Sequence, residues 1–154
     1  MRNLGDITKI NGAEIPVVDV ICGGSPCQDL SIAGNRAGLA GERSGLFMEQ
    51  IRIIKEMREH DRQSGRSDDL IRPRFLVWEN VAGALSSPGG ENSGKDFQAV
   101  LTEIARVAEP GCPDVPLPKN GKWPKSGFIY KSRMGGCFSI AWKLHDAQYW
   151  GVPQ

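Results

Sequence analysis

A cysteine framed by glycine and proline is the most reactive candidate in this 154-residue sequence. Cys27 stands in the run Gly24-Ser25-Pro26-Cys27-Gln28, which predicts a rigid and exposed turn. A thiolate is the strongest nucleophile among the common side chains, so this setting indicates covalent catalysis. Cys22, Cys112 and Cys137 lack such a setting and are interpreted as small buried hydrophobic residues.

A carboxyl group, that of Glu79, is the second candidate. It ends an apolar segment in the run Trp78-Glu79-Asn80-Val81. A carboxyl group at the end of a buried strand is expected to be partly desolvated. Such a group suits the donation of a hydrogen bond or a proton to a ring nitrogen. An ion pair with Arg43 or Arg74 would explain the same residue equally well, so Glu79 alone leaves both interpretations open.

The elements that would position these side chains alternate between strand and helix. Short apolar runs predict strands, and apolar residues at a 3.6-residue period predict helices. Ser44 and Ser93 are the expected N-caps of the two helices. The expected elements are a strand at 16–22, a helix at 46–60, a strand at 74–79, a helix between 93 and 110 and a strand at 137–144, with irregular chain at 111–136.

This alternation predicts an α/β fold in which right-handed crossovers join parallel strands. Ligands of open α/β sheets bind beyond the carboxyl ends of the strands. The segment that carries Cys27 leaves the carboxyl end of the first strand, and Glu79 stands at the carboxyl end of the second. The element order therefore predicts that the two reactive side chains share one edge of the sheet.

Composition narrows the class of protein without naming a partner. The formal net charge is +1, which favours neither the presence nor the absence of a nucleic-acid partner. No C-x-x-C pair occurs and only two histidines are present, so we expect no zinc site and four free thiols. No run approaches the roughly 20 apolar residues of a membrane span. We expect a soluble intracellular protein.

Five segments, taken in order, resemble the motifs of the DNA (cytosine-5) methyltransferases. Each is short, but together they extend along nearly the whole chain. The resembling segments are Gly5-Asp6-Ile7-Thr8, the catalytic-cysteine segment Asp19 to Ser31, Arg43-Ser44-Gly45-Leu46-Phe47, Trp78-Glu79-Asn80-Val81 and Gly151-Val152-Pro153-Gln154.

The resemblance implies a partial Rossmann-like methyltransferase fold, with a mostly parallel sheet flanked by helices. It implies S-adenosylmethionine as cofactor, double-stranded DNA as partner and methylation of C5 of a flipped cytosine. It implies no metal and no membrane. The setting would be the cytoplasm of a bacterium, with a restriction-modification or phage origin; the oligomeric state is not implied.

The resemblance also assigns roles to individual residues. It implies that Cys27 and Glu79 are catalytic. A glycine-rich loop at 33–42 would close over the DNA as a lid. The cofactor-binding residues would be Asp6, Ile7, Pro26 and Leu46, and the substrate-binding residues would be Gln28, Ser31, Arg36 and Asn80.

The sequence departs from the family pattern in several places. The Phe-x-Gly-x-Gly motif, the acid that grips the ribose, both arginines of the Gln-x-Arg-x-Arg motif and a target-recognition domain are not found. We therefore expect residues 1–154 to be one part of a catalytic domain. On its own, this part is expected to bind S-adenosylmethionine weakly at best and not to turn over.

Two other functions stay open at this point. One is a transfer-RNA cytosine-5 methyltransferase of the same chemistry, and the other is a non-catalytic DNA-binding remnant. The stretch 115–145 has six basic and no acidic residues, with Trp123, Phe128 and Tyr130 interleaved. Cations and aromatics suit phosphates and stacked bases, but a solvated basic loop explains them equally well, and no site is placed there.

Overall fold

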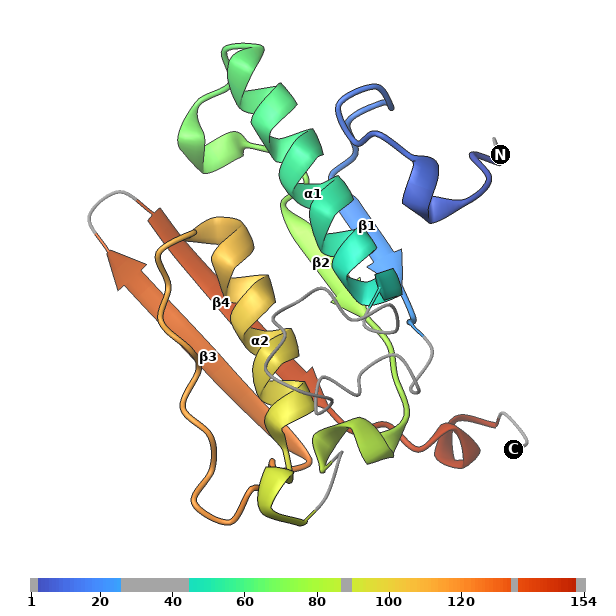
Figure 1. Ribbon diagram of the computed structural model, residues 1–154, viewed down its shortest axis with the longest axis vertical. Coiled ribbons are helices and arrows are strands. Elements are labelled where there is room, and N and C mark those ends of the chain that lie inside the picture. The colour runs from blue at the N-terminus through green and yellow to red at the C-terminus, as the bar shows by residue number, and fades with distance from the viewer. Residues whose placement is uncertain (1–2, 26–44, 87–89, 134–135, 152–154) are drawn as a thin grey trace.

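Two pairs of strands and two long helices make up the computed structural model of the chain (Figure 1). The structure describes residues 3–25, 45–86, 90–133 and 136–151. The elements are β1 (Val20–Gly23), α1 (Gly45–Gln63), β2 (Phe75–Trp78), α2 (Lys95–Ala108), β3 (Ser126–Arg133) and β4 (Gly136–Lys143), with short 3-10 turns that include η1 (Ile7–Lys9), η4 (Ala82–Leu85) and η6 (Ala147–Trp150).

The parallel pair of β1 and β2 confirms the central prediction of the element order. Val20 lies opposite Phe75, and Gly23 lies opposite Trp78. Helix α1 forms the crossover between the two strands, as expected for a β-α-β unit. Both carboxyl ends therefore meet at one edge, although each strand is shorter than its apolar run predicts.

Helices α1 and α2 lie on the same side of the strands in Figure 1 and pack against one another. Their apolar faces, with Ile51 and Leu101 at 1% exposure, close the core over Leu76 and Trp78 of β2. An aromatic cluster continues this core. Phe97 lies 6.3 Å from Trp78 and 5.7 Å from Trp142, between ring centroids.

The start of α2 differs from the prediction. Its N-cap is Gly94, in the left-handed region at φ 78°, and no side chain caps it. The Ser93 hydroxyl instead donates to the carbonyl oxygens of Ser86 and Gly121. A side-chain carbon at Gly94 would approach the Gly121 carbonyl oxygen to 2.3 Å. A close backbone contact between two loops therefore stands at this helix start in place of the expected serine cap.

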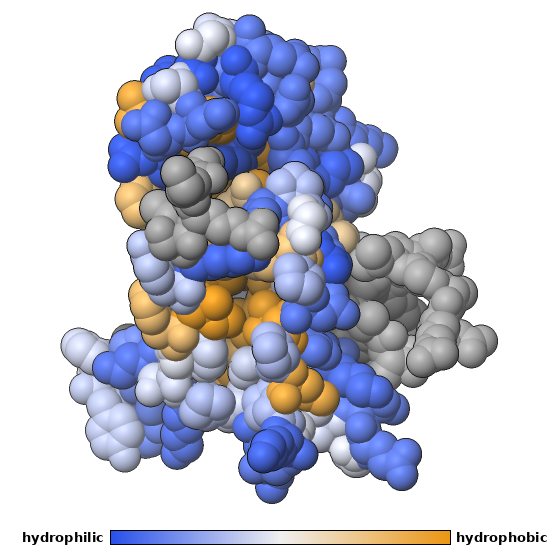
Figure 2. Space-filling view, turned by 90° about the vertical axis from the view of Figure 1, so that its left-hand side faces the viewer, coloured by the Kyte–Doolittle hydropathy of each residue, from blue (hydrophilic) through white to orange (hydrophobic). Residues whose placement is uncertain are grey.

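The strand near the end of the chain does not join the parallel sheet, which corrects the expected topology. β4 pairs antiparallel with β3, and β3 lies within the stretch expected to be irregular. The two pairs form separate sheets among the described residues. β2 and β4 line opposite sides of an apolar groove whose floor includes Val100 and Leu101 of α2. Figure 2 shows hydrophobic surface gathered in a hollow of this face.

The outer face of the parallel pair is open, so helices flank it on one side only in the described part of the chain. Phe75 is 57% exposed and Val77 is 51% exposed. Parallel sheets are normally covered on both faces. The structure thus supports a mixed α/β fold with a small parallel sheet and helices, which is less than the partial Rossmann-like fold, with a mostly parallel sheet flanked by helices, that was expected. No helix in the described segments has the length and apolar character needed to cross a membrane.

Candidate active site

The carboxyl ends of β1 and β2 are fastened together by three hydrogen bonds. The Glu79 N–H donates to the Gly23 carbonyl oxygen over 3.0 Å. The Asn80 side-chain amide donates to the Ser25 carbonyl oxygen over 2.8 Å. The Trp78 indole N–H donates to the Ser25 hydroxyl oxygen over 3.2 Å. The segment leading to Cys27 is therefore held directly against the Glu79-Asn80 pair.

The Glu79 carboxylate faces this segment. A side-chain carbon added at Gly24 would lie 3.0 Å from Oε2 of Glu79, so Gly24 admits the carboxylate close to the backbone. Glu79 is exposed, which corrects the expectation of partial desolvation, because β2 ends one residue earlier. Among the described residues Glu79 forms no ion pair, and Arg74 instead lies over the Phe75 ring at 5.6 Å.

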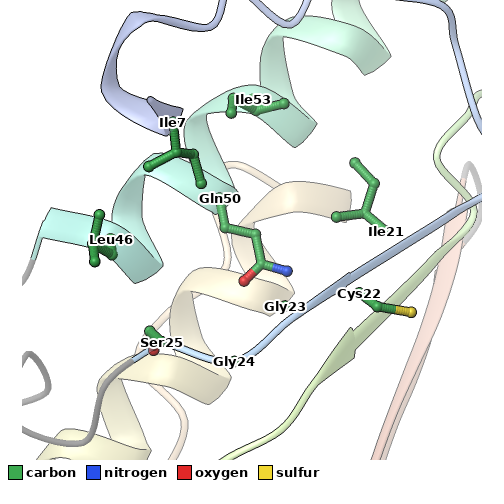
Figure 3. A pocket seen from close by; sticks show the side chains of 9 residues that line it. All are labelled: Ile7, Ile21, Cys22, Gly23, Gly24, Ser25, Leu46, Gln50 and Ile53. Carbon is green, nitrogen blue, oxygen red and sulfur yellow. The ribbon is translucent and has the colours of Figure 1, made fainter. Parts of the chain in front are cut away.

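A pocket of about 270 Å³ opens at the same strand end (Figure 3). Ile7 and Leu46, two of the predicted cofactor-binding residues, both line it. Gly24 and Ser25 also line it, so one short segment separates the pocket from Glu79. The full lining is Ile7, Ile21, Cys22, Gly23, Gly24, Ser25, Leu46, Gln50 and Ile53.

Arg52 and Glu56 of α1 hold the N-terminal segment that supplies Ile7. Arg52 donates to the carbonyl oxygens of Ile7 over 3.2 Å and Ile10 over 2.9 Å. Glu56 accepts the Gly12 N–H over 2.7 Å. Burial alone would raise the pKa of Glu56, but the hydrogen bonds from Arg52 and Gly12 lower it overall. The ionised pair therefore fixes one wall of the pocket.

Asp6 lies beside the pocket but does not line it. Its carboxylate caps η1 by accepting the Thr8 N–H over 3.0 Å and the Thr8 hydroxyl over 2.9 Å. The structure thus brings Ile7 and Leu46 together and places Glu79 and Asn80 across the strand end. Asp6 has a local capping partner already.

Gln50 is one of the lining residues that the sequence prediction missed. It lies four residues after Leu46, and Ile53 lies seven after, so the three share one face of α1. Gln50 is 7% exposed, and its Nε2 has no hydrogen-bond partner among the described residues. The signal that could have found it is this spacing from Leu46.

The remaining predicted site residues lie outside the described part of the chain. These are Pro26, Cys27, Gln28, Ser31 and Arg36, together with the proposed lid at 33–42 and the expected cap Ser44. Their roles stay predictions. The described residues contain no cluster of three or more potential metal ligands.

The basic and aromatic stretch is divided by the structure. Trp123 belongs to the core, with its ring 5.4 Å from that of Phe97. Phe128 and Tyr130 are exposed on the outer face of β3, with their rings stacked at 6.4 Å. Lys131 forms an ion pair with Glu109 at 2.8 Å. The stretch is therefore not a single cationic surface.

Comparison with known proteins matches the chain to one family of DNA methylases and to individual methyltransferases. C-5 cytosine-specific DNA methylases, as a family, match residues 1–107. The DNA N-6-adenine-methyltransferase of Escherichia phage P1 is 35% identical over the whole chain. The orphan methyltransferase M.SPRI of Bacillus phage SPR is 35% identical over 57% of the chain. The type II methyltransferase M.BsuFI of Bacillus subtilis is 27% identical over 97%.

The chain spans only a small part of these relatives. It covers 21% of the phage P1 protein, 17% of the phage SPR protein and 25% of the Bacillus subtilis protein. The match therefore identifies a region rather than a whole enzyme.

Proposed function

The chain belongs to the C-5 cytosine-specific DNA methylase family, and we propose that it forms the catalytic centre of a DNA cytosine-5 methyltransferase. Cys27 is the nucleophile, and Glu79 is the acid that assists it at the target base. The chain is proposed to act within a longer enzyme, because it covers only 21%, 17% and 25% of these three relatives.

The observation that carries this proposal is the contact between the two strand ends. Ser25, which precedes Cys27 by two residues, accepts a hydrogen bond from the Asn80 side-chain amide through its carbonyl oxygen. Gly24 faces the Glu79 carboxylate. A thiol that follows this segment and an acid that abuts it can act on one substrate at the carboxyl edge of a parallel pair. The exposure of Glu79 leaves its carboxyl group free to meet a base from outside.

The chemistry of cytosine explains why these two groups are needed. C5 is a poor nucleophile, and addition of the Cys27 thiolate to C6 converts C5 into an enamine-like carbon. Glu79 donates a hydrogen bond or proton to N3 as electrons enter the ring. After methylation, loss of the C5 proton lets the C6–S bond break, which restores the aromatic ring and the thiolate. The base must leave the duplex stack for this attack.

The pocket beside the strand end fits part of S-adenosylmethionine, which when bound supplies the methyl group. Ligand pockets for drug-sized molecules usually measure about 300–1,000 Å³, so about 270 Å³ suits the adenosine portion. Ile7 and Leu46 offer apolar walls for a flat ring. Gln50 offers a buried amide nitrogen, Nε2, that has no hydrogen-bond partner among the described residues. Gly24 and Ser25 border this pocket and the Glu79 side, so the methyl donor and the base are proposed to meet there.

The name of the phage P1 relative points to a different acceptor, the exocyclic nitrogen of adenine. The chain covers 21% of that protein, whereas C-5 cytosine methylases match two-thirds of the chain as a family. Transfer of a methyl group to an exocyclic amine has no need of a thiolate that adds to C6. We therefore propose cytosine C5 as the acceptor, and DNA rather than transfer RNA.

A product analysis tests this assignment. The complete methyltransferase that contains this chain would be incubated with radiolabelled S-adenosylmethionine and with duplex DNA or transfer RNA, and the nucleosides would be separated. We expect label in 5-methylcytosine from DNA. Label in N6-methyladenine, or in RNA alone, would overturn the proposed acceptor or the proposed substrate class. Glu79→Gln should reduce the rate, whereas Glu91→Gln, which changes an exposed acid in the turn Gly90–Asn92, should not.

A further inference from the structure

Gln50 is a buried polar side chain on the face of α1 that also carries Leu46 and Ile53. Its neighbours on the helix, Ile51, Ile53 and Ile54, are all buried. The exposure of Gln50 is 7%, yet its Nε2 finds no partner among the described residues. Buried amide groups are nearly always hydrogen-bonded in folded proteins, so an unpaired one calls for a physical reason.

Gln98 of α2 shows the ordinary arrangement. Its Nε2 donates to the Val115 carbonyl oxygen over 2.7 Å and ties the helix to the following loop. Gln50 makes no corresponding bond in the described structure. Its amide instead reaches the wall of the pocket shown in Figure 3, above the end of β1.

Gly23 makes this position possible. A side-chain carbon at Gly23 would lie 2.6 Å from Oε1 and 2.7 Å from Nε2 of Gln50. The whole amide group therefore lies against the backbone of β1. It presents one donor and one acceptor side by side, at the edge of a pocket walled by Ile7, Leu46 and Ile53.

We propose that Gln50 is a cofactor-binding residue that recognises the edge of the adenine ring. The inference rests on the proposed function, because it takes the pocket to be that of S-adenosylmethionine. An amide side chain pairs with adenine through the amino group and an adjacent ring nitrogen. Apolar residues on either side suit the ring faces. Bound adenine would give the Gln50 Nε2 the partner that it lacks among the described residues.

The test is an NMR-monitored titration of the complete, isotope-labelled methyltransferase that contains this chain, which detects weak binding up to millimolar ligand. The probes are S-adenosylhomocysteine and adenosine. The variants are Gln50→Met, which keeps the length and removes both polar atoms, and Gln98→Met as a matched control on α2. Loss of this contact should weaken the binding of both probes about tenfold in Gln50→Met, and Gln98→Met should bind as the wild type does.

Direct observation of the wild type keeps the inference testable if Gln50→Met does not fold. The side-chain NH₂ signals of Gln50 should shift along the same saturation curve as the pocket residues. Unchanged affinity in Gln50→Met, or NH₂ signals that do not move while the pocket saturates, would overturn the role of Gln50 alone. A loss for S-adenosylhomocysteine but not for adenosine would overturn the adenine contact. No saturable shift in the wild type would overturn the cofactor pocket itself.

Discussion

Arg52→Met should release the N-terminal segment from α1 and weaken the proposed cofactor pocket. Arg52 holds Ile7 and Ile10 through two hydrogen bonds to carbonyl oxygens. The side chain is 33% exposed, so each bond is worth about 1 kcal/mol rather than the larger value of a buried charged one. The segment should lose about 2 kcal/mol of docking free energy. If ligand binding must restore all of this docking free energy, the affinity for S-adenosylhomocysteine drops by at most about thirtyfold.

Arg106→Met is the matched control for this prediction. Arg106 is also 33% exposed and donates to Glu103, to Asp114 and to the Cys112 carbonyl oxygen, but it lies on α2. Urea unfolding should show similar losses of stability for the two variants, and the NMR titration should show weaker binding only for Arg52→Met. Equal affinities in the two variants would refute the claim that Arg52 builds the pocket wall.

Three further changes test the packing and the electrostatics of the fold. Arg72 donates to the Asp61 carboxylate and holds the pKa of that group well below its usual range. The stability that this contact provides is complete above the ordinary aspartate pKa and is lost as the pH falls below that value. Between pH 7 and pH 3, the melting temperature of Asp61→Asn should therefore fall by less than that of the wild type. Leu101→Ala should cost about 2–5 kcal/mol in urea unfolding, because Leu101 is fully buried in the core; a loss below about 1 kcal/mol would contradict that packing. Gly23→Ala should displace the Gln50 amide and lower adenosine affinity in the same titration, and unchanged affinity would show that the amide is not pressed against β1.

The meeting of the two strand ends could be predicted from the sequence because it depends only on element order. A strand, a helix and a second strand place both carboxyl ends on one edge, and the apolar run before Gly23 and the one before Glu79 mark those ends. The structure confirms the parallel register. The exposure of the Glu79 carboxyl group could not be predicted, because it depends on whether the strand ends at Trp78 or one residue later.

The pairing partner of the strand expected at 137–144 could not be predicted from the sequence. Alternating residues indicate a strand but say nothing of which strand it pairs with. Its partner β3 lies in a stretch rich in glycine and proline, where Gly127 leaves room for the Trp142 ring, which an added side-chain carbon would meet at 2.0 Å. Gln50 was missed for a related reason, since a glutamine in a helix is normally a solvated residue. Only the geometry shows that it is buried.

Mechanism-based trapping measures the central claim most directly. The complete methyltransferase would be mixed with duplex DNA that carries 5-fluorocytosine at the target position and with S-adenosylmethionine, because fluorine at C5 prevents release of the enzyme. Peptide mapping by mass spectrometry should place the DNA adduct on Cys27, and Cys27→Ser should abolish it while Cys112→Ala, a change in the core and outside the pocket, retains it. An adduct on another residue, or one that persists in Cys27→Ser, would contradict the account.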